Sequence, residues 1–341
     1  MTFKQRLIRQ LKAKEALLLL ITVIIALAFF ANNRFFLSLG SLQGIMQVMS
    51  VTGIMAIGMS FLFIGGGIDL SMTFVSLFSG VICALMIRGG VPWGIAVVIT
   101  LSVGVIIGAV NAFFVTKVGI MAFIVTIAMS QILQGVNLIL TNAQDIPVAV
   151  AEGHTFAWGS NIIWIFPAPF VIMAVLMIIY GTILTQTQFG RNIFLVGGNE
   201  YAARLAGVNP KKVRAILYMN AGFLSSLTGV VFISRMRSAA PATAADWQMN
   251  AITAAILGGV SFGGGSGSML GCFIGVAMLN FFTWGLNSIA FPVHWTTMAS
   301  GALLLIALTA DFVNERSRLK ALKVKPAAPP SKMVEDATKG G

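Results

Sequence analysis

Residues 43–71 read QGIMQVMSVTGIMAIGMSFLFIGGGIDLS. As far as Ile64 the stretch contains no charged side chain, and its length is roughly the 20 residues that a helix needs to cross a bilayer. The apolar run then stops at three consecutive glycines, and Asp69 follows almost at once. A membrane helix that ends in glycines beside a carboxylate is therefore the unit from which the rest of the chain can be interpreted.

Similar apolar runs occupy most of the chain. Of its 341 residues, 57% are hydrophobic and 9% are charged, and the mean hydropathy is +0.93. This composition excludes a soluble domain, and the runs lack the alternation of a membrane β-barrel. The sequence predicts an all-α polytopic membrane protein with about ten transmembrane helices, at residues 15–33, 43–64, 69–87, 93–115, 119–141, 164–185, 213–233, 250–262, 268–285 and 295–311.

The net charge of +12 predicts the orientation of these helices. Short loops rich in Lys and Arg stay in the cytoplasm. With the N- and C-termini both cytoplasmic, every basic residue falls on that side except Arg34, Arg88, Arg235 and Arg237. We expect a basic cytoplasmic N-terminus, a lipid-embedded transmembrane domain and a basic, disordered cytoplasmic tail, at residues 1–14, 15–312 and 313–341.

Two glycine clusters interrupt the apolar runs, and the segment 250–262 is short for a full crossing. Irregular backbone at membrane depth occurs where protein or a cavity surrounds it. The clusters therefore indicate half-helices near a translocation path, or else ordinary turns, and whether 250–262 crosses the membrane fully stays open. The glycines concerned are Gly65, Gly66, Gly67, Gly258, Gly259, Gly263, Gly264 and Gly265.

Few side chains in the apolar segments offer chemistry. Asp69 either caps the following helix or lines a path through the membrane. Amides inside a membrane need partners or water, so they line a path or form hydrogen bonds between helices. The candidate path residues are Asp69, Asn111, Gln134, Asn137, Asn250 and Asn280.

The sequence predicts no catalytic residue, no metal site and no nucleic-acid partner. His154 and His294 lack metal-ligand spacing, and no lysine follows the glycines of 258–268 as a phosphate-binding loop requires. The basic residues flank membrane segments instead of forming a nucleic-acid motif. A nucleotide, if one is used, must bind to another chain.

The basic loop 186–214 contains signals for a short helix of its own. Asn199 suits the N-cap, Glu200 favours the positive end of the helix, Gly207 suits a left-handed C-terminal position, and Pro210 blocks continuation. A helix over 200–206 is too short to be stable alone. It either presents small residues, Ala202 and Ala203, to a cytoplasmic partner or lies as a connector on its own membrane domain.

Three sets of motifs resemble those of ribose-type ABC importer permeases, in the branched-chain amino acid/sugar permease superfamily. The first is Ala56-Ile57-Gly58-Met59 with Gly66-Gly67-Ile68-Asp69-Leu70-Ser71. The second is Gly190-Arg191 with Val196-Gly197-Gly198-Asn199-Glu200 and Ala202-Ala203-Arg204-Leu205-Ala206-Gly207-Val208. The third is the stretch 254–267 with Gly271. They stand in the family's order and cover most of residues 35–312.

The resemblance implies a permease subunit in the bacterial cytoplasmic (inner) membrane. It would move a monosaccharide or similar small polar solute into the cytoplasm by alternating access. The implied partners are a cytoplasmic ATP-binding cassette subunit, an extracytoplasmic solute-binding protein, and a second permease copy or paralogue. ATP and Mg would bind to the ATPase, so this chain is expected to be no enzyme and to hold no cofactor.

Two alternatives stay open. The same type of permease could carry branched-chain amino acids, urea or a furanose signalling molecule. An ion-coupled secondary transporter or channel would need ionisable residues in the membrane core, and apart from Asp69 and Asp311 the helices offer almost none.

The resemblance also implies that 190–208 docks on the ATPase. The implied coupling residues are Gly190, Arg191, Gly198, Asn199, Glu200, Ala202, Ala203, Arg204, Leu205 and Gly207. The chain departs from the family pattern at Thr73, at Asn250 and at Gln134-Gly135, where a glycine, an acidic residue and an Arg-Gly pair are common. These departures predict that the polarity of the path differs from that of a ribose permease.

Overall fold

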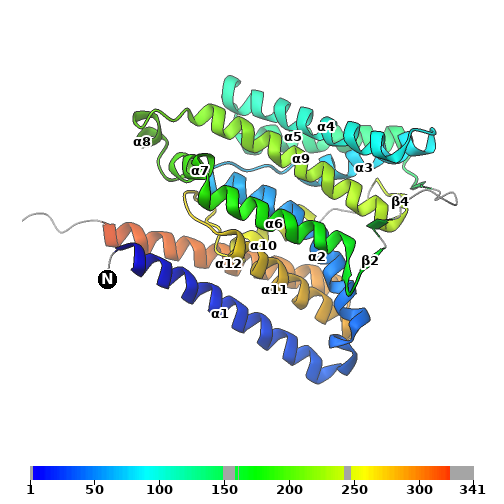
Figure 1. The fold of residues 1–341 in the computed structure, drawn as a ribbon, viewed down its shortest axis with the longest axis horizontal. Helices are drawn as coiled ribbons and strands as arrows, with labels where there is room; N and C mark the ends of the chain where they lie inside the picture. The colour runs from blue at the N-terminus through cyan, green and yellow to red at the C-terminus, as the bar shows by residue number, and fades with distance from the viewer. Residues whose placement is uncertain (1–2, 149–157, 160, 242–246, 323–341) are drawn as a thin grey trace, which may run out of the picture.

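The computed structural model describes residues 3–148, 158–159, 161–241 and 247–322, which form a bundle of helices (Figure 1). The helices are α1 (Phe3–Asn32), η1 (Arg34–Leu37), α2 (Leu39–Ile64), α3 (Met72–Arg88), α4 (Trp93–Ala112), η2 (Phe113–Val118), α5 (Ala122–Thr141), α6 (Ala168–Gln186), α7 (Gln188–Gly198), α8 (Glu200–Leu205), α9 (Pro210–Met236), α10 (Trp247–Leu257), α11 (Met269–Ser288) and α12 (Val293–Leu322). Two short antiparallel pairings, β1 (Ile146–Pro147) with β4 (Ser238–Ala239) and β2 (Ile162–Ile163) with β3 (Phe166–Pro167), complete the described part.

Each of the ten predicted segments contains a helix, so the all-α membrane fold is confirmed. Eight helices are long and apolar enough to cross a bilayer, and α3 is a shorter apolar helix. The remaining one, α10, has 11 residues. At 1.5 Å per residue it spans roughly half of a hydrocarbon core, so α10 is a half-helix.

Several predicted boundaries were wrong. Helix α3 begins at Met72 and not at the predicted residue 69, so Asp69 lies in the turn before the helix. Helix α9 begins at Pro210, three residues before the predicted span. Helix α12 continues to Leu322, so the predicted disordered tail does not begin at 313. Residues 323–341 and His154 lie outside the described part of the chain.

Helix α2 is the centre of the bundle. Every residue from Met49 to Ile64 is buried, and the helix packs against α6, α9, α10 and α11. A helix that is apolar on all sides is expected to be enclosed by others. By contrast, α1, α4, α5 and α12 expose many large apolar side chains, such as Leu17, Val98 and Leu305, which suits contact with lipid.

The two ends of the bundle carry different elements. Helix α1 begins and α12 ends at the same end of the bundle as α7 and α8, while β2 and β4 lie at the opposite end (Figure 1). We call these the α8 end and the β4 end. The predicted topology puts both termini and the loop 186–214 on one side of the membrane, and the arrangement agrees with that. That the α8 end faces the cytoplasm stays a prediction.

Candidate functional site

At the α8 end, the basic loop folds into two short helices with clear caps. The Asn199 side-chain oxygen accepts the N–H of Ala202 at 3.0 Å and starts α8, and Gly207 has a left-handed φ of 78°. The predicted short helix is thus confirmed. Pro210 does block its continuation, but it also serves as the first residue of α9, behind the Asn209 N-cap.

Helix α7 was not predicted. Its N-cap is Thr187, whose hydroxyl accepts the N–H of Gly190 at 3.1 Å. Gly190 is required at this corner because a Cβ there would overlap the carbonyl oxygens of Leu184 and Ile183. A Ser or Thr cap before a helix-compatible run was the available signal.

An acidic residue ties α8 to the start of α9. Glu200 forms ion pairs with Arg204 on its own helix and with Arg214 of α9, the latter at 2.8 Å. The hydrogen bond from Arg204, followed by the charge of Arg214, holds the pKa of Glu200 below its ordinary value of 4.5. Glu200 is therefore ionised at neutral pH and helps to orient α8.

The exposed face of α8 differs from the expected one. Ala203 is fully buried against its own chain, so a partner cannot approach this residue and that half of the prediction was wrong, whereas Ala202 is exposed. Tyr201 and Leu205, one helical turn apart, are 73% and 74% exposed instead. Tyr201 was missed, although its i, i+4 spacing to Leu205 on a short capped helix was a usable signal.

Glycines from three distant segments meet beneath α7. The N–H of Gly265, in the loop after α10, donates to the carbonyl of Ile64 at the end of α2, at 2.9 Å. A Cβ at Gly197 of α7 would overlap that same carbonyl oxygen, and one at Gly264 would lie 2.7 Å from the carbonyl oxygen of Gly197. The contact is backbone against backbone. The glycine clusters thus meet next to α7, and Gly197 was missed by the prediction.

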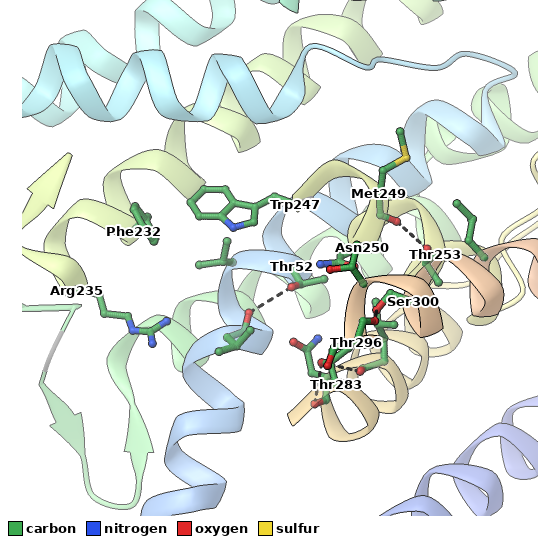
Figure 2. Close-up of a pocket in the computed structure, with 17 residues that line it drawn as sticks. Thr52, Phe232, Arg235, Trp247, Met249, Asn250, Thr253, Thr283, Thr296 and Ser300 are labelled. Atoms are coloured by element: carbon green, nitrogen blue, oxygen red, sulfur yellow. Dashed lines mark hydrogen bonds between the residues drawn. The ribbon is translucent and has the colours of Figure 1, made fainter. Parts of the chain in front are cut away.

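A cavity of about 460 Å³ lies among α2, α9, α10, α11 and α12 (Figure 2). Its wall combines hydroxyls, amides, one guanidinium and two aromatic rings, Phe232 and Trp247, which pack edge to face at 4.6 Å. Its polar and aromatic lining residues are Thr52, Phe232, Arg235, Trp247, Asn250, Thr253, Asn280, Thr283, Thr296, Thr297 and Ser300. Figure 2 shows that Thr52 and Asn250 lie close together between Trp247 and Thr296.

The cavity contains two of the six candidate path residues. Asn250 and Asn280 line it, whereas the other four, Asp69, Asn111, Gln134 and Asn137, do not. Of the eight glycines predicted to lie near a path, none lines it either. Gln134 and Asn137 are on α5, whose main packing partners are α3 and α4.

Asp69 belongs to a separate buried network. Its carboxylate accepts the backbone N–H of Ser71 at 2.8 Å and the hydroxyl of the same residue. The Asn111 amide donates to that hydroxyl at 2.9 Å and reaches the second carboxylate oxygen at 3.4 Å. The carboxylate is 1% exposed and holds the turn before α3. The N-cap of α3 is Ser71, which makes no side-chain capping bond, and the carboxylate of Asp69 bonds to Ser71 and not to an N–H of the helix, so the predicted capping role is not observed.

The cavity occupies the half of the bundle toward the β4 end. It is bounded by the first turns of α10 and α12 and the last turns of α9 and α11, for example at Trp247, Thr296, Arg235 and Thr283. Toward the α8 end, the second half of α2 is completely buried. The cavity therefore does not extend to the α8 end in this conformation.

The comparisons with known proteins identify the family. A family model described as "Branched-chain amino acid transport system / permease component" matches residues 41–308. The chain belongs to this family. The permease is 33% identical to the ribose import permease protein RbsC of Escherichia coli (strain K12), over 91% of this chain and 95% of that protein. The resemblance to ribose-type ABC importer permeases is confirmed.

Other relatives of the permease are sugar transport proteins by name. It is 32% identical to the L-arabinose transport system permease protein AraH of Escherichia coli (strain K12), over 86% of this chain and 88% of that protein. It is 29% identical to the fructose import permease protein FrcC of Rhizobium meliloti, over 90% and 87%. No solved structure matches significantly. The permease is a multi-pass membrane transport subunit and not an enzyme.

Proposed function

We propose that the permease imports a monosaccharide or a similar small neutral polyol, driven by a separate ATPase. The observation that carries this proposal is the lining of the cavity, which among the residues that the structure describes combines many hydroxyls and amides with one tryptophan and holds no carboxylate. Hydroxyl groups of a sugar both donate and accept hydrogen bonds, as Thr, Ser and Asn side chains do. The volume of about 460 Å³ is within the usual range for a small-molecule site.

The same lining argues against two of the alternatives, an amino acid and an ion-coupled mechanism. An amino acid carries a carboxylate and an ammonium group, and each buried charge needs a partner. Arg235 could pair with the carboxylate, but the described lining residues include no acidic side chain for the ammonium group. An ion-coupled transporter would need ionisable residues that relay the ion, and among the described lining residues Arg235 stands alone in being ionisable. Relatives named for ribose, arabinose and fructose favour the same conclusion.

The α7–α8 segment is the proposed docking surface for the ATPase. Tyr201 and Leu205 form an exposed apolar centre, and Arg204 and Lys211 line a shallow hollow beside them. Aromatic and aliphatic anchors within a polar rim are typical of protein interfaces. Leu205 and Arg204 were predicted coupling residues, and Tyr201 is added to them. The ATPase would hold ATP and Mg, and this chain would hold no cofactor.

The charge distribution supports the orientation. The α8 end carries Arg191, Lys211 and Lys212, which favours the cytoplasm. The β4 end, where the cavity lies, would then receive solute from an extracytoplasmic binding protein. The permease would work beside a second copy or a paralogue in the bacterial inner membrane.

Uptake assays in proteoliposomes test the function. The permease is reconstituted with its ATPase and solute-binding protein, and radiolabelled ribose, arabinose, fructose, leucine and urea are supplied outside. We expect ATP-dependent uptake of at least one sugar. Leucine or urea uptake alone would favour the amino-acid or urea alternative, and uptake driven by an ion gradient without ATPase would contradict the proposal.

A further inference from the structure

The loop 258–268 lies between the proposed docking segment and the cavity. It follows α10, whose Asn250 and Thr253 line the cavity. On the opposite side Gly264 and Gly265 meet Ile64 of α2 and Gly197 of α7 through backbone atoms. Close-packed backbone has no flexible side chain to absorb a displacement. A shift of α7 must therefore move this loop, provided that the loop is held to the helices around the cavity.

A carboxylate of α12 holds the beginning of the loop. One oxygen of Asp311 accepts the backbone N–H of Phe262 at 3.0 Å and the hydroxyl of Ser261 at 3.4 Å. Both hydrogen bonds end on the same carboxylate oxygen, so Asp311 joins two consecutive loop residues to α12. Earlier on the same helix, Thr296 and Ser300 line the cavity. Helix α12 thus touches the cavity with one part and the loop with another.

A second carboxylate holds the end of the loop. The hydroxyl of Ser268, the N-cap of α11, donates to Glu15 of α1 at 2.7 Å and accepts the N–H of Gly271 at 2.9 Å. The loop is therefore fixed at both ends by the two terminal helices, with the glycines that contact α7 in between. Among the residues whose side chains the structure describes, neither carboxylate forms an ion pair, so the loop provides their polar contacts.

We propose that Asp311 is a positioning residue of the import cycle. By accepting the N–H of Phe262 it makes the loop a rigid link, so that movement of α7 is passed to α10 and to the cavity. Without this acceptor the loop changes its own conformation when α7 moves, and α10 stays in place. ATP hydrolysis then continues while little solute is transported. The inference rests on the proposed function, because it assumes that the α7–α8 segment receives the motion of an ATPase.

The test compares Asp311→Ala, which removes the acceptor, with Asp311→Asn, whose amide oxygen can still accept the Phe262 N–H. Thr309→Ala is the matched control, because Thr309 is exposed on the same helix and its hydroxyl, among the described residues, bonds to the Leu305 carbonyl of its own helix. Each variant is reconstituted with the ATPase and the binding protein. The measurements are ATPase copurification, the rate of ATP hydrolysis, and sugar imported per ATP hydrolysed.

For Asp311→Ala we expect normal ATPase copurification, hydrolysis at or above the wild-type rate, and a fall of about tenfold in sugar imported per ATP. Asp311→Asn and Thr309→Ala should stay within about twofold of wild type. An unchanged ratio in Asp311→Ala, an equal loss in Asp311→Asn, or loss of ATPase copurification would each overturn the inference. A wild-type complex that imports none of the sugars would instead contradict the proposed function.

Discussion

Gly197 and Ile64 touch through backbone atoms although they lie on different helices and far apart in the sequence. The carbonyl of Ile64, the last residue of α2, faces Gly197 so closely that a Cβ there would overlap it. The same carbonyl accepts the N–H of Gly265. The proposed docking helix α7 is thus seated directly on the end of the central helix and on the loop that leads from the cavity.

Gly197→Ala should therefore damage the permease. The added methyl group must displace backbone, so we expect at least the roughly 1–3 kcal/mol that overpacking costs, with a lower thermal unfolding temperature in detergent and weaker import. Gly198→Ala is the matched control, because a Cβ at Gly198 would lie 3.8 Å from Gly265 in ordinary contact. Equal unfolding temperatures for the two variants would contradict the backbone contact.

Truncation of the exposed face of α8 should weaken ATPase binding without unfolding the permease. Tyr201→Ala and Leu205→Ala each remove an exposed anchor, and central interface anchors cost about 2 kcal/mol or more, roughly 30-fold in affinity. Copurification of the ATPase measures the effect. Leu305→Ala, an exposed leucine on α12, should leave copurification unchanged. Ala203→Trp should destabilise the permease itself, since Ala203 is buried.

The cavity asparagines should determine sugar affinity. Asn250→Leu removes a neutral hydrogen-bonding group, so we expect the half-saturating sugar concentration to rise about two- to tenfold. Asn137→Leu is the comparison, because Asn137 is buried on α5 and its amide has no hydrogen-bond partner in the structure. It should leave the half-saturating concentration unchanged. The reverse order of effects would place the sugar near α5 instead.

The order of α8 should depend on pH in the acid range only. The pKa of Glu200 is lowered in the folded protein, so its ion pairs stabilise α8 fully above about 4.5 and are lost as the pH falls through the lower folded value. A spin label at Tyr201→Cys should therefore gain mobility below this range and not between pH 6 and 8. In Glu200→Gln, the mobility should be high at neutral pH and insensitive to acid.

Cysteine labelling tests the orientation. Both native cysteines, Cys83 and Cys272, are buried, so the labelling background is low. A membrane-impermeant maleimide added outside intact spheroplasts should label Asp145→Cys, which is exposed beside β1. It should label Tyr201→Cys only after the membrane is permeabilised. Labelling of both from the outside would contradict the proposed topology.

The sequence was sufficient where the governing interactions are local. The ten helical segments follow from hydropathy, and α8 follows from the Asn199 cap and Gly207 because a cap acts within one helical turn. Helix α7 was missed because the segment 186–214 was assigned as a loop from its basic residues, and Thr187, the N-cap of α7, lies within that segment. Asn111 and Asn250 are both amides in apolar segments, so the sequence does not distinguish them. Only the packing of the helices places Asn111 in the buried network of Asp69 and Asn250 in the cavity wall.

What the sequence by itself determined is the membrane class, the segments that form helices and the permease family. These follow from composition, periodicity and motif order, which are properties of contiguous residues. Only the tertiary structure decided that Ala203 points inward and Tyr201 outward, that Asn250 and Asn280 share a cavity, and that Ile64, Gly197 and Gly265 meet. Those facts depend on how closely helices from distant segments pack, and packing distance is not encoded in any single stretch.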